Sequence, residues 1–167
     1  MIIRKSFKLE MGHRVVGSYT TGCQSNHGHS AVVELFLEAK TLDHTGMIID
    51  FTEVKDLLGD FFNQFDHRTL VWDQDVEYLE ALEKLGFALM IVPYNSTAEN
   101  ISKHMYQFVR EALKNRVRVA SVRYHETVTG YAEYFVEDYD RDAMNNNLFD
   151  LSHVFLSEAT CIKEYQR

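Results

Sequence analysis

The chain has 167 residues, of which 46% are hydrophobic and 13% aromatic, and this length and composition predict one folded domain rather than a disordered chain. The formal net charge of −8 excludes a broad basic face for nucleic acid, and no apolar run is long enough to span a membrane. The first residues lack a signal-peptide pattern and two cysteines are too few for a disulfide framework, so we expect a cytoplasmic protein with reduced thiols.

Two strands with one buried face each are predicted at the start of the chain. From Ile3 to Val15, and again from His27 to Ala39, apolar residues alternate with polar ones, which is the period of a half-buried β-strand. His13 lies in line with the apolar face near the end of the first strand, and His27 and His29 do so at the start of the second. Antiparallel pairing of the strands makes these ends neighbours, so that three imidazoles converge.

Three convergent histidines favour a metal site over three separate core residues. A lone histidine on an apolar strand face is usually a core residue with one hydrogen bond, but several imidazoles are costly to bury without partners. One zinc ion satisfies all three, and three histidines with an open fourth position are typical of catalytic zinc. Cys23, four residues before His27, is therefore either the fourth ligand or a separate reactive thiol.

Two helices are predicted in the middle of the chain. Asp50 begins a sequence similar to a capping box, and apolar residues then repeat at helical spacing from Val54 to Phe65. Ser96 to Glu99 forms a second capping box, which precedes a helical repeat from Ile101 to Leu113. A capping box supplies hydrogen-bond partners for the first backbone N–H groups of a helix.

Shorter patterns surround the second of these helices. Residues 76–85 favour a short helix, and residues 87–92 form an apolar segment of undefined type. Residues 117–126 and 129–136 are typical of a β-hairpin that turns near Thr129-Gly130. The predicted order is strand, strand, helix, connection, helix, strand, strand.

With these elements in place, the chain resembles the 6-pyruvoyltetrahydropterin and 6-carboxytetrahydropterin synthase family. The motifs occur in the family's order: Phe7 with His13, Cys23-x3-His27-Gly28-His29, TGMIIDF (45–51), FDHRTL (65–70), STAEN (96–100) and HET (125–127). The resemblance implies an α+β tunnelling fold (T-fold) of ββααββ order, with a four-stranded antiparallel sheet and two main helices on one face. It makes residues 1–136 the catalytic domain, with an insertion at about 71–93, and leaves 137–167 as a C-terminal extension of unassigned role.

The resemblance also implies roles in metal binding and catalysis. The zinc (Zn2+) ligands are expected to be His13, His27 and His29. Cys23 is expected to be the catalytic proton acceptor, because a thiol near a metal loses its proton more readily. Asp66 and His67 are expected to form a second proton-transferring pair, in which the carboxylate fixes the imidazole tautomer.

A further set of residues is expected to bind the substrate. Glu126 is expected to accept hydrogen bonds from the pterin ring, with Thr127 and the turn from Thr97 to Glu99 near the same pocket. The alternation of the strand places four residues on the face of Glu126: Arg118, Ala120, Val122 and Tyr124. An acidic chain that binds a triphosphate also needs local basic groups, for which the candidates are Arg14, Arg68 and Lys103.

The motif spacing distinguishes members of the family. Cys-x3-His-Gly-His is typical of the carboxytetrahydropterin synthases of the 7-deazaguanine and queuosine route, whereas the pyruvoyl synthases usually have more residues between the cysteine and the histidine. The resemblance therefore predicts a zinc-dependent lyase that converts 7,8-dihydroneopterin triphosphate to 6-carboxy-5,6,7,8-tetrahydropterin, with release of triphosphate and acetaldehyde. The alternative within the family is a pyruvoyl synthase, which eliminates triphosphate but keeps the whole side chain.

Two other classes and the assembly complete the expectations. A GTP cyclohydrolase-like hydrolase binds zinc with two cysteines and a histidine, whereas only Cys23 is available near this site. A non-catalytic, zinc-stabilised oligomeric binding protein is the alternative from another class. Because the family's active sites form between subunits, the resemblance implies a homo-oligomer, typically a hexamer of two trimers.

Overall fold

The structure is a computed structural model that describes residues 1–159 of the chain. Its elements, in order, are β1 (Ile2–His13), α1 (Thr21–Gln24), β2 (His27–Glu38), α2 (Phe51–Asn63), β3 (Arg68–Trp72), α3 (Val76–Lys84), β4 (Leu89–Val92), α4 (Ala98–Leu113), β5 (Arg118–His125), β6 (Tyr131–Phe135), α5 (Val136–Met144), the 3-10 turn η1 (Leu151–His153) and β7 (Phe155–Ser157). In this part of the chain, no helix combines the length and the apolar character that a membrane span requires.

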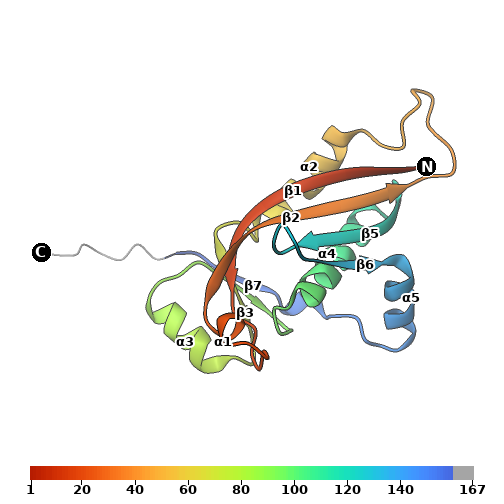
Figure 1. Cartoon of the computed structure of the whole chain (residues 1–167). Coiled ribbons are helices and arrows are strands. Elements are labelled where there is room, and N and C mark those ends of the chain that lie inside the picture. Colours follow the sequence, from red (N-terminus) through yellow and green to blue (C-terminus); the bar gives the residue numbers. More distant parts are fainter. Residues whose placement is uncertain (160–167) are drawn as a thin grey trace, which may run out of the picture.

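One mixed sheet of seven strands organises these elements, in the order β6-β5-β2-β1-β3-β4-β7 (Figure 1). The strands β6, β5, β2 and β1 pair antiparallel, as the sequence predicts. The expectation that the sheet stops at four antiparallel strands is wrong, because β3 pairs parallel with both β1 and β4, and β7 adds to β4. Most of the expected insertion at about 71–93 therefore belongs to a β3-α3-β4 unit, whose two strands extend the sheet.

The predicted helices form, with one change at a boundary. The Asp50 side chain accepts a hydrogen bond from the backbone N–H of Thr52 at 2.6 Å, which caps α2 as expected. Helix α4 begins one residue later than the predicted box, because Thr97 and not Ser96 is its N-cap. The Ser96 hydroxyl is occupied elsewhere, since it donates to the backbone oxygen of Arg14 at 3.0 Å.

The core lies between one face of the sheet and the helices α2 and α4, which both cover that face (Figure 1). The apolar faces predicted for β1 and β2 are the buried ones, with Leu9, Met11, Ala31, Val33, Leu35 and Leu37 in the core. Strand β5 differs from simple alternation, because its pairing with β2 shifts between Phe36 and Leu37. This irregularity places Val119, rather than Ala120, in the core beside Val122 and Tyr124.

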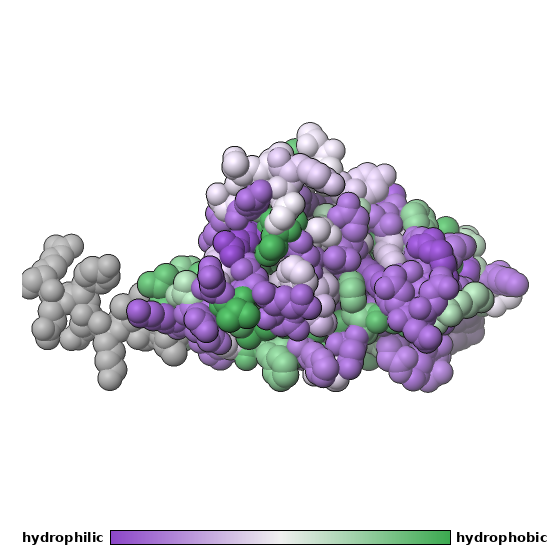
Figure 2. Space-filling view, turned by 90° about the horizontal axis from the view of Figure 1, so that it is seen from below, coloured by the Kyte–Doolittle hydropathy of each residue, from purple (hydrophilic) through white to green (hydrophobic). Residues whose placement is uncertain are grey.

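The residues from the end of β6 to residue 159 fold onto the same body. Helix α5 follows β6 directly, and β7 pairs antiparallel with β4 at the edge of the sheet. Cys161 lies outside the described residues. On the face drawn in Figure 2, hydrophilic side chains predominate and the apolar ones form small separate patches, in agreement with the acidic composition.

Candidate functional site

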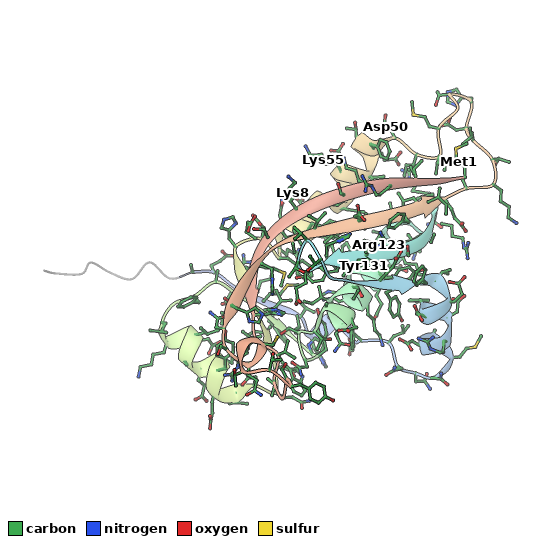
Figure 3. The ribbon with its side chains drawn as sticks, in the orientation of Figure 1. Met1, Lys8, Asp50, Lys55, Arg123 and Tyr131 are labelled. Carbon is green, nitrogen blue, oxygen red and sulfur yellow. The ribbon has the colours of Figure 1, made fainter. Side chains whose placement is uncertain are left out.

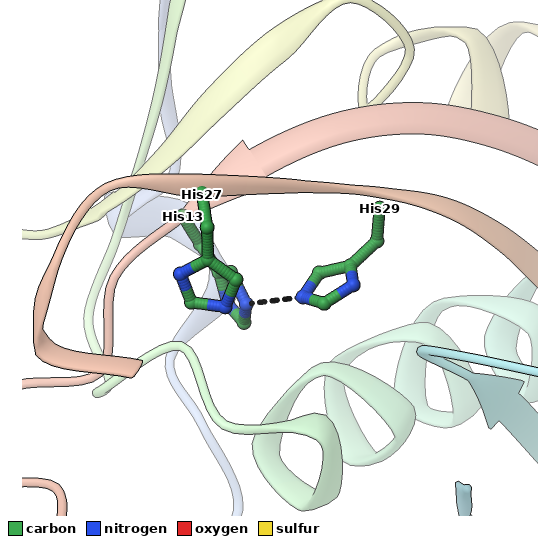
Figure 4. A group of neighbouring side chains, drawn as sticks. All are labelled: His13, His27 and His29. Carbon is green, nitrogen blue, oxygen red and sulfur yellow. Dashed lines mark hydrogen bonds between the residues drawn. The ribbon is translucent and has the colours of Figure 1, made fainter. Parts of the chain in front are cut away.

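Three histidines meet where β1 ends and β2 begins (Figure 4). The antiparallel register places His13 directly opposite His27, and His29 lies opposite Met11 on the same face of the sheet. One possible ligand atom from each ring lies within 4.8 Å of those of the other two, and the Nε2 atoms of His13 and His29 are 3.2 Å apart. The convergence expected from the alternation of the strands is therefore confirmed.

Backbone carbonyl groups determine which nitrogen of two rings faces the cluster. The Nδ1 atom of His13 lies 2.7 Å from the backbone oxygen of Ser96, and the Nδ1 atom of His27 lies 2.8 Å from that of Ser25. A carbonyl oxygen can only accept, so each Nδ1 carries the proton and each Nε2 presents a lone pair. Such an arrangement orients metal-binding histidines in known sites.

The donor atoms of this cluster fit a divalent cation. The Nε2 atom of His13 lies 3.2 Å from that of His29 and 3.3 Å from the Oε1 atom of Glu126. Burial is the main cause that lowers the pKa of His29, against the opposing charge of Glu126, which favours the neutral ring that binds metal. Imidazole nitrogens suit zinc, so His13, His27 and His29 would hold it.

Cys23 lies in the short helix α1, outside the group of convergent ligand atoms. Thr20 caps this helix, and the backbone oxygen of Cys23 accepts a hydrogen bond from Val15 at 2.7 Å. Among the described residues, the only group of three or more histidine, cysteine or carboxylate side chains with convergent ligand atoms consists of the three histidines. This arrangement favours an open metal position over a thiolate as fourth ligand.

Asp66 and His67 form the expected pair, just before β3. One oxygen of Asp66 accepts from Nδ1 of His67 at 2.7 Å, and the other accepts from the backbone N–H of Glu10 at 2.7 Å. The Glu10 bond is the main cause that holds the pKa of Asp66 below its ordinary value, with His67 adding to it. His67 has φ 57°, a left-handed conformation that is unfavourable for residues other than glycine, and 79% of its side chain is exposed.

His67 of the pair and two of the three histidines contribute to the walls of an open depression. Its volume is about 560 Å³, and its lining includes His27, His29 and His67. Gly12 and Gly28 form part of the same wall. A small molecule placed there can therefore meet residues of both groups.

The expected substrate-binding residues lie on two faces of the sheet. Glu126 reaches the cluster, with its Oε1 atom 3.3 Å from His13 and 3.7 Å from His29. Thr97 caps α4 next to Ser96, and Glu99 is exposed in the first turn of the same helix. Thr127 instead lines a hollow of about 190 Å³ with residues of the opposite face.

The three candidate triphosphate ligands all have partners within the chain. Arg14 donates two hydrogen bonds to Asp75, at 2.7 and 2.5 Å. Arg68 contacts the backbone oxygen of Ser157 and the carboxylate of Glu158. Lys103 pairs with Asp142 at 2.8 Å, with both side chains almost fully buried. Each of these three groups therefore already contacts an acceptor within the chain.

The two backbone carbonyl groups that orient His13 and His27 could not be predicted from the amino-acid sequence. Any residue carries a backbone oxygen, so nothing in the side chains of Ser25 and Ser96 marks them. Ser25 lies two positions before His27, but Ser96 lies 83 positions after His13. Only the folded chain brings Ser96 to the site.

Comparison with known proteins identifies relatives that match most of the chain. The family model described as 6-pyruvoyl tetrahydropterin synthase matches residues 2–137. The 6-carboxy-5,6,7,8-tetrahydropterin synthase of Helicobacter pylori (strain J99) is 29% identical over 160 residues, which covers 90% of this chain and 80% of that protein. The protein of the same name from Aquifex aeolicus is 33% identical over 156 residues, which covers 79% of this chain and 96% of that protein.

A solved structure supports the fold independently. The 6-pyruvoyl tetrahydropterin synthase of Caenorhabditis elegans superposes with a TM-score of 0.62 at 20% sequence identity, and the match covers 81% of this chain and 94% of the other. At this level of identity the likeness concerns the fold, and it supports the T-fold predicted from the sequence.

Proposed function

The chain belongs to the 6-pyruvoyl tetrahydropterin synthase family, and from this premise we propose that it acts as a zinc-dependent lyase on 7,8-dihydroneopterin triphosphate. The products are 6-carboxy-5,6,7,8-tetrahydropterin, triphosphate and acetaldehyde. The single observation that carries the proposal is Cys23-x3-His27-Gly28-His29 folded against His13, with a partly exposed side of the cluster beside Glu126. The names of the bacterial relatives favour the same product.

The metal and the chain divide the chemistry. Zinc, when bound by the three histidines, polarises substrate oxygens and eases proton loss from the adjacent carbons. Cys23 accepts a proton from the substrate side chain, which is consistent with its place outside the ligand group. His67, whose Nδ1 is fixed by Asp66, offers Nε2 for the second proton transfer.

Glu126 binds the pyrimidine edge of the pterin in this proposal. That edge presents adjacent N–H donors, and an ionised carboxylate accepts two of them at once. Contact with His13 is the main cause that lowers the pKa of Glu126, against the effect of burial, which favours the ionised form. Thr97, Glu99 and Thr127 are proposed to lie near the same substrate.

The assembly is proposed to be a cytoplasmic homohexamer of two trimers, with sites between subunits. The exposure of His67 and the position of Thr127 on the opposite face support this, because one chain does not bring all the proposed residues to the histidines. A neighbouring copy can supply the missing groups. Arg14, Arg68 and Lys103 already have partners within the chain. This supports a neighbouring copy as a source of the basic groups that bind the triphosphate.

Product analysis tests this function. Purified zinc-loaded protein is incubated with 7,8-dihydroneopterin triphosphate, and the products are identified by mass spectrometry. A 6-carboxy pterin with acetaldehyde supports the proposal. A product that keeps the whole side chain indicates the pyruvoyl synthase instead, and unchanged substrate favours a non-catalytic binding protein.

A further inference from the structure

The segment Tyr94–Thr97 connects the histidine cluster to the rest of the molecule. Its Ser96 carbonyl holds Nδ1 of His13, whose side chain is fully buried. Asn95 exchanges two hydrogen bonds with the backbone of Val16, at 3.1 and 2.8 Å, just beyond the end of β1. The orientation of the His13 ring therefore depends on how firmly this segment is held.

An aromatic stack supports the segment from the other side. The ring of Tyr94, only 3% exposed, stacks on the ring of Phe149 with centroids 4.5 Å apart and planes at 21°. The Tyr94 hydroxyl lies 2.6 Å from Nδ1 of His104 in α4. Tyr94 is thus enclosed between α4 and a residue of the C-terminal extension, two positions before the carbonyl that orients His13.

Phe149 is itself fixed to α4 through its backbone. The amide side chain of Gln107 donates to the Phe149 oxygen at 3.0 Å and accepts from the Phe149 N–H at 3.1 Å. Two reciprocal bonds of this kind hold both the position and the direction of the peptide chain. The stack on Tyr94 is therefore a fixed contact and not a loose covering.

A buried charge anchors the same stretch of the extension. Lys103 pairs with Asp142, donates to the backbone oxygen of Asn147 at 2.5 Å and lies 4.5 Å from the centroid of the Phe149 ring. Asp142 also accepts from the hydroxyl of Tyr134 at 2.7 Å. A buried ammonium group is stable only when it is paired in this way, so residues 142–149 are held against α4.

We propose that residues 142–149 are a positioning segment for the metal centre, which acts through Tyr94 and Ser96 on His13. The segment lies beyond residue 137, where the match to the family model ends, so this support comes from outside the part of the chain that the family model describes. Groups that orient metal-binding histidines typically contribute 10- to 100-fold to metal affinity. The inference rests on the proposed zinc site, and it names residues that do not touch the metal.

Two phenylalanines of the extension provide a matched test. Phe149→Ala removes the ring that stacks on Tyr94, whereas Phe155→Ala removes a ring of β7 that is 59% exposed. The zinc dissociation constant of the full-length protein is measured by competition with a chelator, and the absorption spectrum of the cobalt-substituted protein reports ligand geometry. We expect Phe149→Ala to weaken zinc binding about 10-fold, the lower end of the usual range, and to change the cobalt spectrum. Phe155→Ala should change neither, and Phe149→Tyr, which keeps the ring, should restore both.

Different outcomes separate this inference from the proposed function. A Phe149→Ala protein that unfolds at a lower temperature but binds zinc as the unmodified chain does would show a merely structural contact and overturn the inference. If that variant does not fold, Gln107→Ala removes the backbone clasp instead, and unchanged zinc affinity in it overturns the inference as well. An unmodified chain that takes up no zinc would overturn both the inference and the metal site of the proposed function.

Discussion

Two polar clusters lie on opposite faces of the same sheet, and they are built differently. On the face that the helices cover, His13, His27 and His29 meet with Glu126 as the nearest carboxylate. On the other face, Glu34 is 8% exposed and receives contacts from Arg4 at 2.5 Å, His125 at 3.0 Å and Arg123 at 3.5 Å. Arg123 in turn pairs with Glu133 and lies over the ring of Tyr131, beside which Figure 3 shows it.

The difference shows how a structural cluster can be told from a site. In the Glu34 cluster, every carboxylate faces a guanidinium or imidazole donor, so the charges are matched within the chain. In the histidine cluster, backbone carbonyl groups accept the Nδ1 protons of His13 and His27, which leaves the Nε2 lone pairs of these two rings without a proton of their own. Such imidazole lone pairs are donors for a cation, whereas a cluster whose charges are matched serves the fold.

Removing one histidine from each cluster is expected to give the largest contrast. His29→Ala deletes one of three ligands, so zinc content should fall to background and turnover should be lost, a greater effect than the 10- to 100-fold of orienting groups. His125→Ala deletes an imidazole of the matched cluster and should keep the zinc. Metal analysis by mass spectrometry checks both, and full zinc occupancy in His29→Ala would contradict the metal site.

A second prediction asks whether Cys23 is a proton acceptor beside the histidine cluster or a fourth metal ligand. If it is the proton acceptor, Cys23→Ala should retain zinc and oligomeric state but lose about 10²- to 10⁴-fold in turnover, the usual contribution of a general base. Cys161→Ala removes the other thiol, to which the family resemblance assigns no role, and is the control. Loss of zinc together with activity in Cys23→Ala would make the thiol a fourth ligand.

Glu126 tests whether the carboxylate of the histidine cluster serves a ligand. Glu126→Gln leaves the pterin donors poorly paired, which should cost about 1.5–3 kcal/mol, or about one to two decades in the dissociation constant of a simple pterin. Zinc content should not change. Glu83→Gln, an exposed residue of α3, is a better control than Glu133, which pairs with Arg123. Calorimetric titration measures both, and equal pterin affinity would make Glu126 a mere surface carboxylate.

The smallest expected effect is on the free energy of unfolding, and it concerns Glu34 in the cluster whose charges are matched. Burial opposes ionisation of Glu34, but the bond to His125 and the charges of Arg4 and Arg123 outweigh it, so its pKa lies below the ordinary 4.5. A lowered folded pKa means that the stabilisation is complete above the unfolded value and is lost as the pH falls through the folded one. Glu34→Gln should therefore cost about 1–2 kcal/mol at pH 7, with the difference from the unmodified chain shrinking below about pH 4.

Urea unfolding of both proteins across pH 3–7 measures this difference. The mutation should leave the zinc content at pH 7 unchanged, because Glu34 faces away from the histidines. A stability difference that stays constant down to the lowest pH would show that Glu34 is not stabilised as an ion. Loss of zinc in Glu34→Gln would break the distinction between the two clusters.

The local sequence pattern was sufficient to predict the long strands and helices and the convergence of the three histidines. The twelve-residue strands β1 and β2 each have one buried face, and a period of two then specifies which residues share it. The helices α2 and α4 carry apolar stripes and side-chain caps that can be recognised within a few positions. The strands β3, β4 and β7 are three to five residues long, and at that length an apolar run has no readable period.

The amino-acid sequence by itself determined the strand faces, the two main helices and the set of three histidines, because each depends on spacing between residues that are close along the chain. Only the tertiary structure decided the extent of the sheet, the irregularity that moves Val119 into the core and the partners of Arg14, Arg68 and Lys103. It also decided that Ser96 orients His13 and that Phe149 supports the segment in which Ser96 lies. These contacts join residues that are far apart in the sequence. Backbone oxygens and stacked rings of this kind become partners only when packing brings them together.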